Sequence, residues 1–529
     1  MSVLRLYRVK LTLPMLIFLF VAGLPPTSWP TPLDDYVAAP DSHYTYNHIS
    51  TIAELGYSAY ILEMTSQQWR TGSEVDRTIW QHWLIIIKPT LAFGSKGLLI
   101  IDGGSNGGSP PLTVDQDLIT AALLTNSVIA QLKMVPNQPL LFSDETVPRS
   151  EDEIIAYSFD KYFTTSDDTW PVLLPMVKSA VRAMDAVHDF ILDQTGFVSV
   201  NQFAVTGGSK RAWTAWLTAA VDPRVISIIP IVFDALNLDE QMVHHLAAYG
   251  FYSPAIQDYV DLNIMDRLDT APGQALLTIV DPYQYRDRYA ALPKYMINST
   301  GDQFFLPDST QFYFHDLPGE KHLRYVPNTD HGISDPDAAN SIVRFYSAIL
   351  DNQTRPQYSW TIQSDHSIRV ETVDPPTAVN LWQADSSDTR DFRLETIGPT
   401  WSSSNLTDQG GGVYIGQVPE PDVGWRGFFV ELIYDWGGLA PFKFTTEVYV
   451  IPDTLPHARR ADYDYDGDVD QEDFGAFQLC LSGGGRQYQT GCMWADLDKD
   501  DDVDQTDVDK FQGCMSGANI LYALGCEDS

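Results

Sequence analysis

Three residues whose side chains together could perform acyl transfer each follow a segment expected to be a β-strand. Ser209 lies in segment 203–213, where an apolar strand runs through two glycines into a helix. A strand–Gly-x-Ser–helix turn presents the serine hydroxyl on a sharp elbow. Asp302 and His331 follow later apolar strands, in the chain order serine, acid, histidine. This pattern predicts a triad in which His331 takes the Ser209 proton and Asp302 orients the imidazole.

Two further features of such a site have candidates in the sequence. Asp234 follows the strand after the elbow and is the alternative acid, because this fold class sometimes carries its acid one strand earlier. The tetrahedral intermediate needs two backbone N–H donors. One is expected from Lys210, directly after the nucleophile, and the other from Gly103 or Gly104 in a loop behind a buried strand. An ordinary turn is the alternative for that loop.

Two cations, Lys210 and Arg211, directly follow the nucleophile. They either place positive charge beside a developing oxyanion or an acidic substrate group, or Arg211 pairs with a buried carboxylate beneath the site. The sequence leaves both readings open.

The elements that must position these residues alternate between apolar strands and helices. A helical stripe in 177–192 lies between the early strands and the elbow, and another buried strand is expected at 225–233. This alternation predicts an α/β fold over residues 35–355, with a largely parallel sheet covered on both faces. Segment 239–270 interrupts it with an aromatic, polar and helical pattern, which indicates either a cap over the site or an ordinary crossover with an extra helix.

The periodicity changes from about residue 356. Four short strand-like runs, 367–373, 392–396, 427–434 and 442–451, are separated by Pro, Gly and Asp turns. They predict a small β-sandwich over 356–455. A polar linker with two prolines follows it.

The last segment, 461–529, contains a repeat with an offset of 34 residues, so that Asp462 corresponds to Asp496. Its oxygen-bearing side chains have the spacing of calcium loops, and position 7 of each loop would offer a backbone carbonyl. The module therefore predicts Ca²⁺ as its cofactor, whereas the serine chemistry needs no metal. The residues at the loop positions are Asp462, Asp464, Asp466, Asp468, Asp470 and Asp473 in the first copy, and Asp496, Asp498, Asp500, Asp502, Asp504 and Asp507 in the second.

The four cysteines of the chain also follow the repeat. Cys480 and Cys492 have the same separation as Cys514 and Cys526, which predicts two local disulfides. Crossed pairing between the repeats is the alternative.

Composition and the N-terminus indicate an exported protein. The net charge of −37 argues against binding to nucleic acid or an anionic membrane. Basic residues precede a short apolar run, which predicts a signal peptide over 1–24, secretion or a cell-surface or periplasmic location, and no membrane span after its removal.

The chain resembles two known families. The first is the PhoPQ-activated pathogenicity-related proteins, and the likeness covers about 35–455. It rests on segments 207–214, 221–225, 298–305, 325–331, 391–393 and 444–446. That family implies an exported α/β-hydrolase-like domain with an attached β domain and no settled substrate; its pattern commonly has glycine where Ala212 stands.

The C-terminal repeat resembles a dockerin-type module, which implies a cohesin-like or cell-surface partner. Asp501 departs from it, because the first copy has Gly467 at that sharp turn.

These features favour a secreted serine hydrolase acting on a carboxylic ester that is a small molecule or linked to carbohydrate. A weaker likeness to glucuronoyl esterases, which carry a cation directly after the nucleophile, points to an acidic sugar ester. A peptidase of small peptides is the second enzymatic reading. A non-catalytic binding or signalling protein that retains the fold is the contrasting class.

Overall fold

The computed structural model describes residues 30–268, 270–457, 461–464, 467–489, 492–498, 500, 502–518, 520, 522 and 526. The predicted signal peptide (1–24) and the predicted calcium ligand Asp466 lie outside these residues. Within the described part of the chain, no helix combines the length and the apolar character that a membrane crossing requires.

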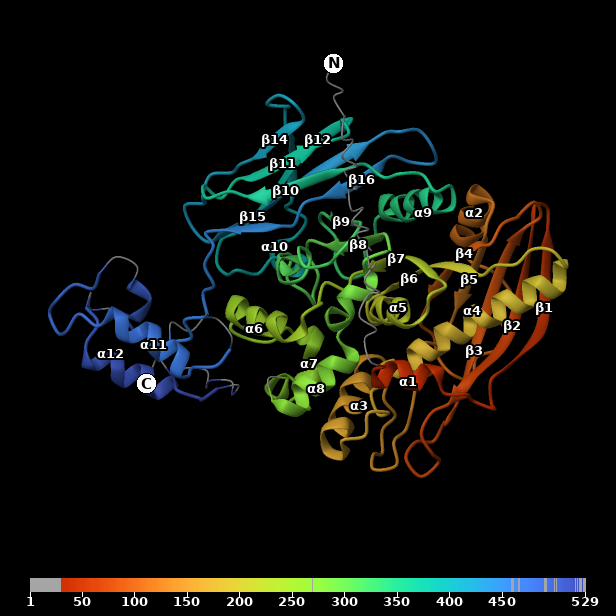
Figure 1. Ribbon diagram of the computed structural model, residues 1–529, viewed down its shortest axis with the longest axis horizontal. Helices are drawn as coiled ribbons and strands as arrows, with labels where there is room; N and C mark the ends of the chain where they lie inside the picture. The colour runs from red at the N-terminus through yellow and green to blue at the C-terminus, as the bar shows by residue number, and fades with distance from the viewer. Residues whose placement is uncertain are drawn as a thin grey trace, which may run out of the picture.

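A mixed 14-stranded sheet forms the centre of an α/β fold (Figure 1). Strands β5, β4, β6, β7, β8 and β9 run parallel, whereas β1, β2 and β3 add an antiparallel edge. The parallel strands are almost wholly buried, as their continuous apolar runs predict. In spatial order the strands are β1 (Thr45–Glu54), β2 (Tyr57–Gln68), β3 (Ile79–Pro89), β5 (Val128–Leu132), β4 (Lys96–Ile101), β6 (Gln202–Gly208), β7 (Val225–Ile231), β8 (Lys294–Ser299), β9 (Lys321–Val326), β16 (Phe442–Thr445), β15 (Trp425–Tyr434), β12 (Ala378–Ser386) and β13 (Ser402–Asn405), with β17 (Tyr449–Ile451) also paired to β15.

Two groups of helices pack on this sheet (Figure 1). The longest helix, α4, contains the helix predicted at 177–192 and buries most of its apolar residues. It packs against α1 and α5, while α2 packs against α9. The helices are α1 (Pro32–Ala38), α4 (Leu173–Thr195) and α5 (Lys210–Val221) in one group, and α2 (Gln116–Thr125) and α9 (Pro336–Leu350) in the other.

In the described part of the segment between β7 and β8, every regular element is a helix (Figure 1). It packs beside α3 (Asp152–Thr165), which contacts both α7 and α8. This is the segment that the sequence identified as a cap or a crossover. Its elements are α6 (Leu238–Tyr249), η1 (Pro254–Ile256), α7 (Gln257–Val260), η2 (Met265–Arg267), α8 (Ala271–Val280) and η3 (Pro282–Tyr289), with η4 (Ser309–Phe312) following β8.

The β region after residue 356 is continuous with the main sheet, which the predicted domain boundary did not anticipate. Strand β16 pairs with β9 through Thr445 and Leu323, so β15, β12 and β13 extend the main sheet. The other sheet of this region has three strands, β10 (Tyr358–Ile362), β11 (Ile368–Thr372) and β14 (Val413–Gly416). It packs closely on the extended sheet, because a Cβ on Gly416 would lie 2.6 Å from the Val430 side chain.

One strand predicted in that region is wrong. Segment 392–396 forms a turn into the short helix α10 (Leu394–Ile397). The cause is local, since Arg393 donates back to the Asp391 carboxylate, which also accepts the Arg393 backbone N–H. Such side-chain to backbone bonds compete with a strand ladder.

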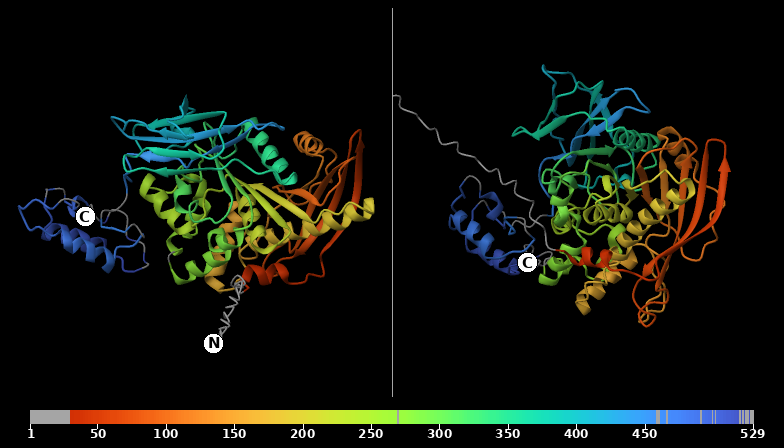
Figure 2. Two further views of the ribbon diagram at one scale, coloured as in Figure 1. Left: turned by 45° about the horizontal axis from the view of Figure 1, so that its top comes forward. Right: turned by 45° about the vertical axis from the view of Figure 1, so that its right-hand side comes forward.

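The C-terminal repeats form a small unit with a core of its own, set apart from the main sheet in two views (Figures 1 and 2). Its helices are α11 (Gln471–Cys480) and α12 (Gln505–Cys514), with the turn η5 (Met493–Ala495) between them. Phe477 and Phe511 pack against each other with ring centroids 4.8 Å apart. Disulfides join Cys480 to Cys492 and Cys514 to Cys526, each within its own repeat, as the equal spacing predicted.

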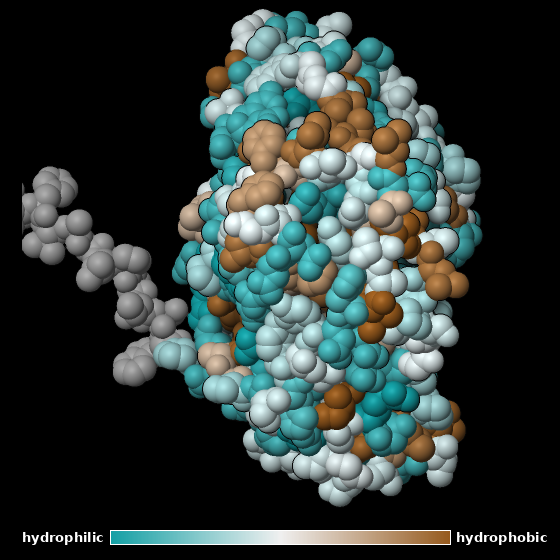
Figure 3. Space-filling view, turned by 90° about the vertical axis from the view of Figure 1, so that its right-hand side faces the viewer, coloured by the Kyte–Doolittle hydropathy of each residue, from teal (hydrophilic) through white to brown (hydrophobic). Residues whose placement is uncertain are grey.

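The face of the molecule that carries β1 and β2 is mostly hydrophilic or near neutral, and its hydrophobic residues lie in several separate groups (Figure 3). Leu55, in the turn between these two strands, is among the most exposed large apolar side chains. Hydrophobic residues scattered in this way are ordinary for a water-facing surface.

Candidate active site

Ser209 lies at a strained turn between β6 and α5. Its φ of 57° and ψ of −129° are outside the regions that L-residues ordinarily adopt. The close approach of strand and helix needs Gly207, because a Cβ there would lie 2.8 Å from the Arg211 backbone. Ser209 is half-buried and lines a cavity. The local geometry is therefore that of a strand–turn–helix elbow with Ser209 at the bend.

Asp302 and His331, predicted as acid and base, are in direct contact. His331 Nδ1 donates to the carboxylate of Asp302, with distances of 2.9 and 2.8 Å to its two oxygens. Asp302 follows β8 and is fixed by the backbone N–H of Phe304 at 2.7 Å. His331 follows β9, whose parallel pairing with β8 brings the two loops to one edge of the sheet.

The other ring nitrogen of His331 is the one that would accept a proton from serine. In the part of the chain that the structure describes, Nε2 of His331 is buried and has no hydrogen-bond partner. Phe304 packs on the imidazole with ring centroids 4.2 Å apart, and the same phenylalanine lines the cavity that Ser209 lines. Phe304 therefore links the acid–base pair to the apolar cavity that the elbow lines. In unliganded enzymes the serine–histidine hydrogen bond commonly tightens only with substrate bound.

Asp234, the alternative acid, makes different contacts. Its two oxygens accept from the hydroxyls of Tyr313 at 2.7 Å and Tyr325 at 2.5 Å. Burial raises the pKa of Asp234 to about 8, although the tyrosine hydrogen bonds lower it. The acid that holds His331 in this structure is Asp302, one strand later than Asp234.

The raised pKa of Asp234 predicts a pH dependence of stability. Its folded-state pKa of about 8 exceeds the unfolded value of about 4, so folding strengthens proton binding. The contribution of this group to stability is complete below pH 4 and is lost as pH rises towards 8. Asp234→Asn cannot ionise, so the variant is expected to lose less stability than the native chain between pH 5 and 8.5. Urea denaturation at both pH values measures this, and parallel pH profiles for the two proteins would contradict it.

Carboxylates neutralise both cations that follow Ser209. Lys210 is buried and its Nζ lies 2.9 Å from Glu151 and 2.8 Å from Asp152. Arg211 contacts Glu151 at 2.7 Å and donates to the carbonyl of Val135 at 2.6 Å. Burial raises the pKa of Glu151, but Arg211 and Lys210 outweigh it and hold that pKa at about 2. Of the two readings of these cations, the structure supports pairing with carboxylates.

Sequence reasoning missed Glu151 and Asp152, which begin α3. The sequence indicated them only indirectly: two adjacent cations at the buried start of a helix require carboxylates that neutralise their charge. Nothing in the local sequence around 151 identifies them as those carboxylates. Glu151 also has a φ of 53°, and its side chain accepts a hydrogen bond from Arg211, two residues after the strained Ser209.

The two glycines predicted for the oxyanion hole differ in availability. The backbone N–H of Gly103 donates to the Asp102 carboxylate at 2.7 Å, which leaves it unable to serve a substrate oxygen. Gly104, with a φ of 128°, adopts a backbone conformation that other residues rarely adopt. Lys210 is the first residue of α5, where N–H groups have no intrahelical acceptor. Lys210 and Gly104 are therefore the better pair of candidate donors.

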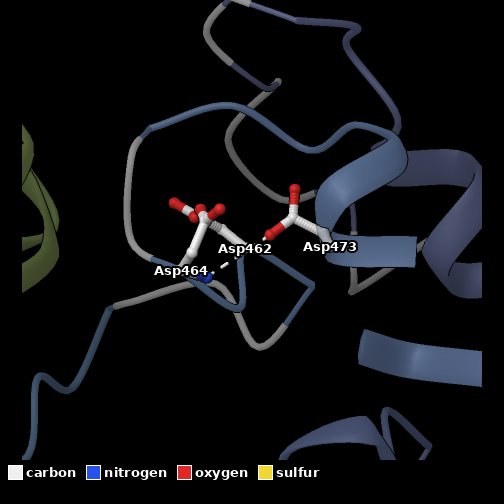
Figure 4. Close-up of side chains that lie close together, drawn as sticks. All are labelled: Asp462, Asp464 and Asp473. Carbon is white, nitrogen blue, oxygen red and sulfur yellow. Dashed lines mark hydrogen bonds between the residues drawn. The ribbon is translucent and has the colours of Figure 1, made fainter. Parts of the chain in front are cut away.

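A second candidate site lies in the C-terminal module. Figure 4 shows Asp462, Asp464 and Asp473 gathered at the start of α11, with carboxylate oxygens within 4.8 Å of one another. Three further groups of this kind fall on the predicted loop positions: Asp468, Asp470 and Asp473; Asp496, Asp498 and Asp500; and Asp502, Asp504 and Asp507.

These donors fit a hard cation. Every side chain in the four groups is a carboxylate, the ligand that Ca²⁺ prefers. Oδ1 of Asp498 and Oδ1 of Asp502 are buried and accept no hydrogen bond from the described residues. Buried carboxylates that lie this close repel one another unless a cation neutralises them.

Comparison with known proteins identifies a family for the larger part of the chain. The family model for the PhoPQ-activated pathogenicity-related protein matches residues 33–393, which include the elbow, Asp302 and His331. The chain belongs to this family. This PhoPQ-related chain is also 38% identical over 487 residues to the autocrine proliferation repressor protein A of Dictyostelium discoideum, covering 87% of this chain and 98% of that protein.

The PhoPQ-related chain is also similar to solved esterase structures. Acetyl xylan esterase 1 from Thermoanaerobacterium sp. JW/SL YS485 is 15% identical, with a TM-score of 0.40 over 60% of this chain and 91% of its own. A glucuronoyl esterase from Solibacter usitatus is 14% identical, with a TM-score of 0.34 over 61% of this chain and 91% of its own. Similarity at this level says nothing of the substrate of the PhoPQ-related chain.

Proposed function

We propose that this protein is a secreted serine hydrolase that cleaves carboxylic esters through Ser209, His331 and Asp302. One observation carries the proposal: the Asp302–His331 pair leaves a buried Nε2 without a partner among the described residues, and Phe304, which packs on this imidazole, lines the same cavity as the elbow serine. A histidine oriented by a carboxylate and a serine on a strained elbow are the parts that acyl transfer requires.

The chemistry follows from these groups. As Ser209 Oγ bonds to the ester carbonyl carbon, Nε2 of His331 takes the hydroxyl proton, and Asp302 stabilises the resulting imidazolium. Backbone N–H groups of Lys210 and Gly104 receive the oxyanion. The bond to the alcohol oxygen breaks and His331 gives that oxygen its proton. Water, activated by the same histidine, then releases the acid and restores Ser209.

Two measurements on the full chain test this function. A fluorophosphonate is expected to label Ser209, and p-nitrophenyl esters are expected to be hydrolysed, because an activated serine reacts with both. Absence of both reactions in folded protein would rule the function out. Faster cleavage of small peptides than of esters would favour the peptidase reading.

We also propose that the C-terminal module binds Ca²⁺ through its aspartate loops and serves as an anchor. The gathered carboxylates support this, as does a count of 17 acidic against 3 basic residues in 461–529. Asp473 and Asp507 are also the N3 residues of the capping boxes that start α11 and α12, so the same carboxylates hold the helix start and the predicted ligand positions. The binding partner proposed for this module is a cohesin-like or cell-surface protein.

Calcium removal is expected to loosen the module without stopping hydrolysis. With calcium at about 100 times its Kd, binding shifts the opening equilibrium of the module about 100-fold towards the folded form. EDTA should therefore accelerate proteolysis within 461–529 and reduce the helical circular dichroism signal, while ester turnover persists. Re-added Ca²⁺ is the control. Unchanged protease resistance would refute the calcium proposal, and loss of turnover would show that catalysis itself depends on metal.

A secreted signalling role is the second candidate function. It rests on the similarity to a protein named as an autocrine proliferation repressor, which extends over most of the chain. The test is whether Ser209→Ala, which removes the nucleophile, retains any growth-regulating effect of the added protein. An effect that needs no Ser209 would make signalling independent of hydrolysis.

A further inference from the structure

The cavity beside Ser209 has an almost wholly apolar lining. It encloses about 70 Å³ and is bordered by residues of β6–α5, the β7 and β8 loops and the cap helices. Trp213 and Phe233 stack in its wall with centroids 5.0 Å apart, and Phe305 meets Phe233 edge-on at 5.8 Å. Leu276 and Leu277 of α8 close it from the cap and are almost fully buried.

The charges at this cavity cancel. Lys210 and Asp152 are the charged residues among the described side chains that line it, and they form an ion pair at 2.8 Å. Glu151 contacts the same lysine, and the hydroxyl of Tyr259 donates to Asp152 at 2.9 Å. A carboxylate in the cavity would meet a cation that two acids already neutralise. Sugar hydroxyls would lose water without gaining partners from the apolar lining.

The residues that line the cavity indicate which half of an ester it receives. After the first step the acyl group stays bonded to Ser209, whereas the alcohol must leave with the proton of His331. Ser209 lines the cavity, whereas His331, which would give its proton to the alcohol, is not among the residues that line it. The cavity therefore suits the group that remains attached to Ser209.

We propose that this cavity is an acyl-binding site that selects short, uncharged aliphatic acyl groups. This inference rests on the proposed ester hydrolysis and replaces the acidic-sugar reading of the cations. A water-sized group needs roughly 10–15 Å³ of such space, so the cavity holds about five carbon-sized groups. The preferred substrates are esters of butyric to hexanoic acid, and each buried methylene raises kcat/KM about fourfold up to that length.

The experiment compares kcat/KM of the full chain for p-nitrophenyl acetate, butyrate, hexanoate and decanoate and for a glucuronate ester. Butyrate is expected to exceed acetate about 16-fold and hexanoate to exceed it about 250-fold, with decanoate and the glucuronate ester lower than hexanoate. Ala235, fully buried in the cavity wall, is changed to leucine (Ala235→Leu), and Met242 of α6 is changed to alanine (Met242→Ala). The first should shift the preference to acetate and the second to longer chains.

Met184→Ala, in the buried part of α4 and outside the cavity lining, removes the same core volume and should leave the acyl preference unchanged. If Ser209 reacts with a fluorophosphonate but the native chain prefers the glucuronate ester, or neither wall variant alters the preference, the acyl site is refuted while the hydrolase stands. If neither labelling nor turnover occurs, the hydrolase and the acyl site are refuted together.

Discussion

Ser209→Ala is expected to lower kcat for ester hydrolysis on the order of a million-fold and to abolish fluorophosphonate labelling. The change removes the only atom that bonds covalently to the acyl group in the proposed reaction, and such losses are typical of nucleophile removal. The hydroxyl contributes little to the fold, because Ser209 is half-buried and makes no cap hydrogen bond to α5. Thermal unfolding should therefore match that of the native chain.

The matched control for this prediction lies in the same helix. Thr214 of α5 is fully buried, and its hydroxyl donates to the Lys210 carbonyl one turn earlier. Thr214→Ser keeps this hydroxyl and should retain labelling and most of the turnover. A Ser209→Ala protein that still hydrolyses esters at the native rate would show that another group is the nucleophile.

Three residues of the candidate site could be predicted because the local sequence specifies their positions. Ser209, Asp302 and His331 each follow a buried apolar strand, and parallel neighbours bring the ends of such strands to one edge. Strand ends and residue types were therefore sufficient to select Asp302 and His331, which the structure brings into hydrogen-bond contact.

Contacts between remote segments account for what the sequence could not predict. Glu151 pairs with Arg211, 60 residues away, and no periodicity links an acidic helix start to a distant cation. Asp234 has the same position behind a strand as Asp302, and only its tyrosine partners from other segments distinguish it. The β region is a similar case, because apolar runs predict strands but not that β16 would pair with β9.

Asp302→Asn is expected to lower kcat about ten-thousand-fold, whereas Asp234→Asn should change it by less than about tenfold at pH 7. The carboxylate of Asp302 holds the Nδ1–H of His331, so Nε2 is left as the basic nitrogen. An amide at 302 can donate to Nδ1 and favours the tautomer whose Nε2 carries the proton and cannot accept one from Ser209. Steady-state kinetics with a short-chain p-nitrophenyl ester measures both variants.

Asp234→Asn is the isosteric control, because burial already keeps this carboxyl largely protonated at neutral pH. Its Tyr313 and Tyr325 partners remain in place, and its effect should appear in stability at alkaline pH. The pH profile distinguishes loss of His331 orientation from loss of folding. The kcat of Asp302→Asn should stay low at every pH at which circular dichroism shows that the variant is folded. A large loss for Asp234→Asn beside a small one for Asp302→Asn would make Asp234 the acid that acts on His331, despite the contact that Asp302 makes in this structure.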